Sequence, residues 1–158
     1  MSRSSVIVVR VVIALAFLAV VLLEVVAVPA TAANAAETYP EFAYLRVPGI
    51  VGSIALLACV QVVLLCVWRL VDLVAAGRIF DERAFVWVDV IIAALWIATG
   101  LVIVGAILLN VTGGTAPGLF YPIIIGVVFG TGAALVVGIM RRLLRQATDL
   151  RGELDEVV

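Results

Sequence analysis

The feature that most constrains this chain is a series of four long apolar runs, each with few or no charged residues. They cover approximately residues 11–28, 48–71, 84–109 and 119–140. A helix of about 20 apolar residues can cross the roughly 30 Å of hydrocarbon in a bilayer. Charged residues make up 13% of the chain, against about a quarter in soluble domains. The sequence therefore predicts an all-α membrane protein, a bundle of four transmembrane helices forming one domain over residues 1–158.

The distribution of arginine predicts how the helices are oriented, because cytoplasmic loops retain an excess of basic residues. Residues 29–47 and 110–118 would form exterior loops, and the fourth helix would extend into the cytoplasm over residues 141–158. Arg46 is the one arginine at the exterior end. We expect both termini in the cytoplasm, since the other arginines all fall at that end: Arg3, Arg10, Arg69, Arg78, Arg83, Arg141, Arg142, Arg145 and Arg151.

Residues 77–81 predict a tight turn between the second and third helices. Gly77 suits the left-handed position that ends a helix, because glycine adopts it without a side-chain clash. Asp81 suits the N-cap of the next helix, where its carboxylate accepts from unpaired backbone amides. Phe80 and Phe85 flank this cap at the spacing of a hydrophobic staple.

The same turn predicts an ion pair. A hairpin that reverses near Ile79 brings Arg69 to the depth of Asp89, and both lie inside apolar runs where an unpaired charge is costly. One prediction is therefore an Arg69–Asp89 pair between two helices. The alternative partner of Arg69 is Asp72, three residues along the same helix.

The turn also carries a family resemblance. Gly77 and Phe80 form a Gly-x-x-Phe motif, which Asp81 and Glu82 follow. With its four-helix topology, the chain resembles the bacterial family called domain of unknown function 2975. Members are often encoded beside a small helix-turn-helix regulator. The resemblance implies a bacterial inner-membrane location and a cytoplasmic helix-turn-helix protein as the partner. We expect no direct contact to nucleic acid.

Several residue types needed for catalysis are missing from the sequence. The chain contains no histidine and no lysine, so it lacks imidazole ligands, the commonest general base and a Schiff-base amine. Cys59 and Cys66 lie about 10 Å apart along one predicted helix, too far to form a disulfide. We predict a protein that is not an enzyme and has no catalytic, cofactor-binding or metal site.

Glu24 is the candidate for transport, because an ionisable group inside a membrane span usually marks a pathway or a partner. It lies about one turn from the exterior end of the first predicted helix, whereas coupling carboxylates tend to lie near mid-membrane. We therefore favour a structural role, at the interface or paired with Arg46. The alternative is a small proton-coupled transporter that uses Glu24 with Gln61 or Asn110. Gln61 is otherwise expected to form an interhelical hydrogen bond.

The fourth helix carries a stripe of small residues at every fourth position, Gly126, Gly130, Ala134 and Gly138. Small side chains allow helices to approach closely in lipid, where no hydrophobic force drives them together. The stripe predicts a packing face, which we expect to contact another helix of the same chain. The alternative is a second copy in a homo-oligomer.

The tail has the spacing of a narrow coiled-coil seam, with apolar residues at alternating steps of four and three. These residues are Leu143, Ala147, Leu150, Leu154 and Val157. The favoured function is a non-enzymatic membrane protein whose turn and tail contact a soluble or membrane partner. The alternative for the tail is a frayed or interface-lying helix end.

Overall fold

The computed structural model of the chain describes residues 3–38, 40–76, 82–112 and 117–155. All of its regular structure in these ranges is helical. The elements in chain order are α1 (Arg3–Leu22), a π-helical turn η1 (Leu23–Ala27), α2 (Val28–Thr38), a 3-10 helix η2 (Pro40–Leu45), α3 (Arg46–Ala75), α4 (Glu82–Val111) and α5 (Pro117–Asp155).

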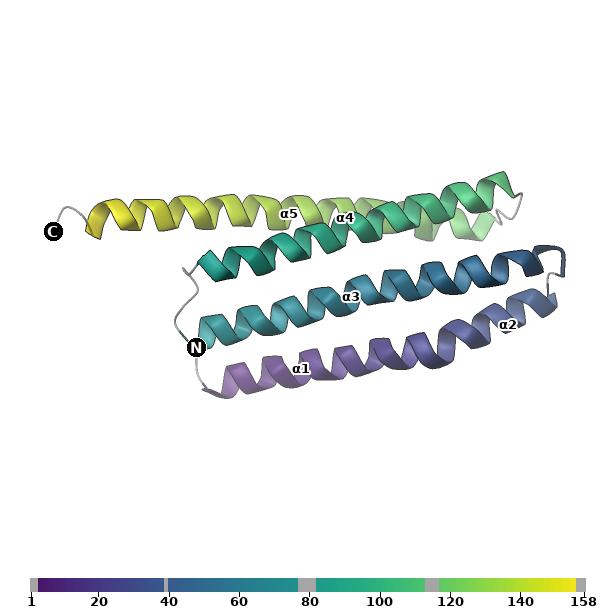
Figure 1. Cartoon of the computed structure of the whole chain (residues 1–158), viewed down its shortest axis with the longest axis horizontal. Helices are drawn as coiled ribbons and strands as arrows, with labels where there is room; N and C mark the ends of the chain where they lie inside the picture. The colour runs from purple at the N-terminus through teal and green to yellow at the C-terminus, as the bar shows by residue number, and fades with distance from the viewer. Residues whose placement is uncertain (1–2, 39, 77–81, 113–116, 156–158) are drawn as a thin grey trace.

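Four helical spans in the described part of the chain are long and apolar enough to cross a membrane. They run over Val6–Thr38, Ala43–Ala75, Ala84–Val111 and Ile123–Gln146. The first span consists of α1, η1 and α2, which continue one another, and the others belong to α3, α4 and α5 (Figure 1). This confirms the predicted all-helical architecture with four membrane-length helices.

The four spans form an open row (Figure 1). Each span contacts its neighbour in the chain: α1 and α2 pack on α3, α3 packs on α4, and α4 packs on α5. Across the described ranges, the backbones of α1 and α2 do not approach those of α4 or α5 closely. The helices run antiparallel, so α1 begins and α5 ends at one end, called here the terminal end (Figure 1). The opposite end, where α2 ends and α3 begins, is called the loop end.

The first span is longer than the sequence predicted. The first helix was expected to end at Val28 and an exterior loop to cover residues 29–47, but α2 is helical to Thr38. Its sequence, VPATAANAAET, is rich in alanine, which has the highest helix propensity. Pro29 follows the π turn η1, which accommodates its missing amide hydrogen inside the continuous helix. The predicted loop is therefore wrong over most of its length.

The helix α5 is the longest element, with 39 residues. At 1.5 Å per residue it spans about 58 Å, nearly twice the roughly 30 Å of bilayer hydrocarbon. Its C-terminal part extends past the terminal ends of the other helices (Figure 1). The helical backbone of the predicted tail is thus described to Asp155, whereas its side chains are described only to Gln146.

The buried core is small, because a row of helices exposes two broad faces. Buried side chains among the described residues include Cys66 of α3, Ala84 and Ala94 of α4, and Ala134 of α5. Most of the apolar surface faces outward, as in Phe129, which is 77% exposed. So much exposed apolar surface is expected for helices that lie in the hydrocarbon of a bilayer.

Candidate functional site

A polar pair joins the first span to α3. The side-chain amide Nε2 of Gln61 donates a hydrogen bond to Oε2 of Glu24, with 2.7 Å between the two atoms. Both side chains are half-buried. A hydrogen bond of this kind between membrane helices contributes on average about 0.6 kcal/mol and at most roughly 1.7. The pair is therefore a stabilising contact and also places an ionisable group at a helix–helix seam.

The local backbone at Glu24 is a π-helical turn. The N–H of Val28 bonds the carbonyl of Leu23, five residues earlier, in place of the usual carbonyl four residues earlier. Pro29 explains why the turn widens here. It has no N–H to offer Val25, and its ring would crowd that carbonyl in a regular α-helix. Single π turns of this type recur at functional sites in proteins.

Glu24 lies farther from the end of its helix than the sequence indicated. Since the first span runs over Val6–Thr38, Glu24 is near its middle, and Gln61 is near the middle of α3. The prediction that Glu24 lies one turn from the exterior end was wrong, because it assumed that the helix ended at Val28. The expected partner Arg46 is also wrong, since Glu24 bonds Gln61.

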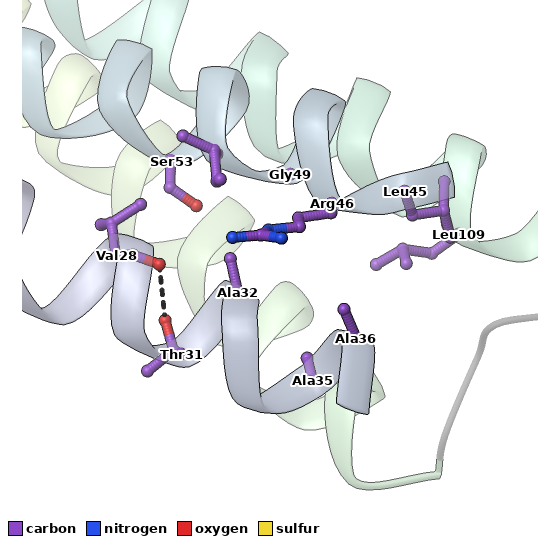
Figure 2. A pocket seen from close by; sticks show the side chains of 11 residues that line it. Val28, Thr31, Ala32, Ala35, Ala36, Leu45, Arg46, Gly49, Ser53 and Leu109 are labelled. Carbon is purple, nitrogen blue, oxygen red and sulfur yellow. Dashed lines mark hydrogen bonds between the residues drawn. The ribbon is translucent and has the colours of Figure 1, made fainter. Parts of the chain in front are cut away.

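Two cavities flank the Glu24–Gln61 pair along the same seam. On the terminal side, a cavity of about 730 Å³ between α1 and α3 includes Val21 and Leu64 in its wall. On the loop side, a cavity of about 350 Å³ between α2 and α3 includes Val28 and Ser53 (Figure 2). The seam is thus loosely packed on both sides of its central polar contact.

The seam ends in an ion pair at the terminal end. Nη2 of Arg10 donates to Oδ1 of Asp72 over 2.6 Å. This pairing overturns one predicted partner of Arg69, because Asp72 is engaged by the first span. Arg10 was identified only as an orientation signal in the sequence. Its position at the start of the first apolar run, level with the acidic residue that follows the second run, is the signal that would have found this pair.

The predicted Arg69–Asp89 pair is also wrong, because Asp89 binds Arg141 of α5. Nη2 of Arg141 donates to Oδ2 of Asp89 over 2.6 Å. Nε of Arg141 lies 2.6 Å from Oδ1, an ionic contact without hydrogen-bond alignment. Arg69 instead lies over the ring of Trp87, with 5.9 Å from its guanidinium carbon to the ring centroid. Arg69 does lie close to α4, as the predicted hairpin implied. The rotation of each helix about its own axis determines which side chain Arg69 contacts.

The small residues of α5 face α4. A Cβ at Gly130 would overlap Oγ1 of Thr99, and a Cβ at Gly126 would lie 3.7 Å from Cγ1 of Val102. Ala134 is only 3% exposed. At Gly138 an added Cβ would meet nothing within 4 Å. The first three residues of the stripe therefore line the contact with α4, and the fourth does not.

Part of the predicted partner surface lies outside the described residues. Gly77, Phe80 and Asp81 of the predicted turn are outside the described residues. Phe85 is described, and it is half-buried near the start of α4. In the tail, Leu143 is 52% exposed. The side chains of Ala147, Leu150 and Leu154 and the whole of Val157 are outside the described part.

The cysteines remain separate. Cys59 is half-buried and Cys66 is buried, and both are free thiols. Among the described residues, no three histidine, cysteine, aspartate or glutamate side chains converge as metal ligands would.

These features define a class of protein. The described chain is a multi-pass helical membrane protein in which polar side chains pair across neighbouring helices. The family model described as "Protein of unknown function (DUF2975)" matches residues 30–158. The chain belongs to this family, which confirms the resemblance seen in the sequence. No curated protein and no solved structure matches the chain. Glu24 lies before the matched residues, and Gln61 and Arg46 lie within them.

Proposed function

We propose that this protein is a non-enzymatic membrane protein that binds a cytoplasmic partner through the end of α5. The single observation that supports this function is the length of α5. Its helical backbone continues to Asp155, beyond the terminal ends of the other helices (Figure 1). A membrane helix needs no such extension to span hydrocarbon, so the projecting segment is available to a partner.

The arginine distribution supports a cytoplasmic position for this end, in a bacterial inner membrane. Arg141, Arg142 and Arg145 lie where anionic headgroups would meet the helix. Beyond them, the seam spacing of the tail fits a partner helix. A small helix-turn-helix protein is the partner class that the family resemblance implies. Binding such a protein at the membrane would regulate its access to DNA.

The test is a pull-down from native membranes in mild detergent, with bound proteins identified by mass spectrometry. Full-length protein is compared with a chain truncated after Arg145 and with the double variant Leu150→Ala/Leu154→Ala on the seam. The matched control, Thr148→Ala/Asp155→Ala, changes residues off the seam. A partner that is lost in the truncated and seam variants and retained by the control supports the proposal. Identical recovery by all four proteins contradicts it.

A second candidate function is proton-coupled transport through the α1–α3 seam. The observation that favours it is the mid-span Glu24–Gln61 hydrogen bond with a cavity on each side. Carboxylates that couple proton movement to transport tend to lie at this depth. Glu24 would exchange a proton with either cavity as its contact with Gln61 breaks and re-forms.

The transport candidate is tested by proton flux into liposomes that contain the purified protein and a pH-sensitive dye. Glu24→Gln keeps the side-chain shape and an acceptor for Gln61 but removes the ionisable group. Glu37→Gln, which removes an exposed carboxylate of α2, is the matched control. Flux that is abolished by the first change and kept by the second supports transport. Flux equal to that of empty liposomes in all samples contradicts it.

A further inference from the structure

The cavity between α2 and α3 contains a cation with no counter-ion among the described residues. Arg46 has no ion pair or hydrogen bond there, and no aspartate or glutamate belongs to the cavity wall. Arg46, Gly49 and Ser53 lie on one face of α3, at the i, i+3, i+7 spacing of a helix. The opposite wall is formed by α2, largely by alanines (Figure 2).

The direction of the Arg46 side chain is unusual. Helical side chains lean toward the N-terminus of their helix, which at Arg46 is the loop end and the water beyond it. The guanidinium instead extends in the opposite direction, past Ala32 toward Ser53 (Figure 2). An arginine near a membrane surface normally extends toward water, because hydrocarbon does not solvate its charge. An anion in the cavity would stabilise a guanidinium directed into the span.

The hydroxyl groups in the wall indicate which ligand chemistry fits. The hydroxyl of Thr31 donates within its own helix, to the carbonyls of Ala27 and Val28. Ser53 has no hydrogen-bond partner among the described residues, and its hydroxyl is turned toward the same space as Arg46 (Figure 2). One cation and one free hydroxyl donor among apolar walls match a phosphate or carboxylate head attached to an apolar chain.

We propose that this cavity binds an anionic phospholipid from the leaflet at the loop end. Arg46 and Ser53 would bind the phosphate, and an acyl chain would lie in the groove of small residues between α2 and α3. The occupant is a lipid because the cavity lies between neighbouring helices of an open row, within the Val6–Thr38 and Ala43–Ala75 spans. Arg46 and Ser53 are both exposed, so a lipid beside these helices can reach them.

The experiment uses full-length protein in phosphatidylcholine vesicles that contain a small fraction of a photoactivatable lipid, either phosphatidylglycerol or phosphatidylcholine with the same chains. Crosslinked peptides are mapped by mass spectrometry. We expect the phosphatidylglycerol probe to label residues 28–53 at least about tenfold more than the phosphatidylcholine probe. Both carry a phosphate, but the quaternary ammonium of phosphatidylcholine offsets the phosphate charge that a guanidinium would bind.

Two variants test the two parts of the site. Arg46→Gln removes the cation and should reduce phosphatidylglycerol labelling of residues 28–53 to the phosphatidylcholine level. Gly49→Leu fills the groove, because a Cβ at Gly49 meets nothing within 4 Å and needs no backbone shift. It should lower labelling as well. The controls Arg142→Gln and Gly132→Leu make the same changes elsewhere, at positions where the structure has room, and should keep the labelling.

Equal labelling of residues 28–53 by both probes, or full labelling of Arg46→Gln, overturns the proposal. Size-exclusion chromatography of each variant verifies that it is folded. A separate arm adds dodecyl phosphate to protein in neutral detergent and measures thermal stability. If dodecyl phosphate stabilises the protein through Arg46 but phosphatidylglycerol gives no labelling of residues 28–53, the occupant is a free amphiphile and the lipid assignment is wrong.

Discussion

The seam between the first span and α3 differs from the seam between α4 and α5. The first is polar, with Glu24 bonded to Gln61 at mid-span, a π turn in its backbone and a cavity on either side. The second is closely packed, with Gly130 directly against Thr99. The comparison shows that one apolar chain builds two kinds of helix contact. One is held by close approach of backbones, and the other by polar pairs with cavities beside them.

The largest expected effect is at the closely packed seam. Gly130→Val should destabilise the protein by about 1–3 kcal/mol, the usual cost of overpacking, because the new Cβ overlaps Oγ1 of Thr99. Reversible unfolding in mixed micelles measures this change. The control Gly132→Val adds the same side chain two residues away, where a Cβ meets nothing within 4 Å. Equal stability of the two variants would mean that α4 and α5 do not approach this closely.

The next effect concerns the polar seam. Gln61→Leu removes the donor to Glu24 and should cost about 1 kcal/mol. A double-mutant cycle with Glu24→Leu, which removes the acceptor, isolates the contact from other consequences of each change. Gln61→Glu would place two carboxyl groups together and serves as the repulsive control. A coupling energy near zero would show that the two side chains do not interact in the folded protein.

A smaller effect is expected at the ion pair between α4 and α5. The side chains of Arg141 and Asp89 are 29% and 50% exposed, so their coupling should be only about 0.2–1 kcal/mol. A cycle of Asp89→Asn with Arg141→Gln measures it. The matched cycle with Arg69→Gln should give no coupling, because Arg69 lies over Trp87. Coupling to Arg69 in place of Arg141 would restore the pairing predicted from the hairpin.

The smallest change in stability is expected for Pro29→Ala, within about 0.5 kcal/mol, because a π turn would be exchanged for a regular α turn. The substitution should instead change the distance between the side chains at positions 24 and 61. Cysteines introduced at Glu24 and Gln61, in a chain with Cys59 and Cys66 replaced by alanine, would be joined by a short thiol crosslinker. We expect lower crosslinking yield in Pro29→Ala than with Pro29. An unchanged yield would show that Pro29 does not cause the π turn.

The sequence predicted individual residues of the candidate site better than their contacts. Glu24 and Gln61 stand out because each is a polar side chain inside an apolar run. Their contact did not follow, since the end of the first helix was set at Val28 and Glu24 was therefore placed too close to that end. The alanine-rich stretch after Pro29 was the available signal that the helix continues, and the family motif gave no information about this seam.

What the sequence determined by itself is the number and type of long elements, together with the family. Membrane-length helices follow from local composition, because every backbone group in hydrocarbon must bond within its own segment. The tertiary structure alone decided that Asp89 meets Arg141, that Gly130 meets Thr99, and that the helices form an open row. The physical reason is that such contacts depend on the rotation and tilt of each helix. In an almost uniformly apolar chain, side-chain packing sets these angles, because hydrophobicity alone does not distinguish one helix face from another.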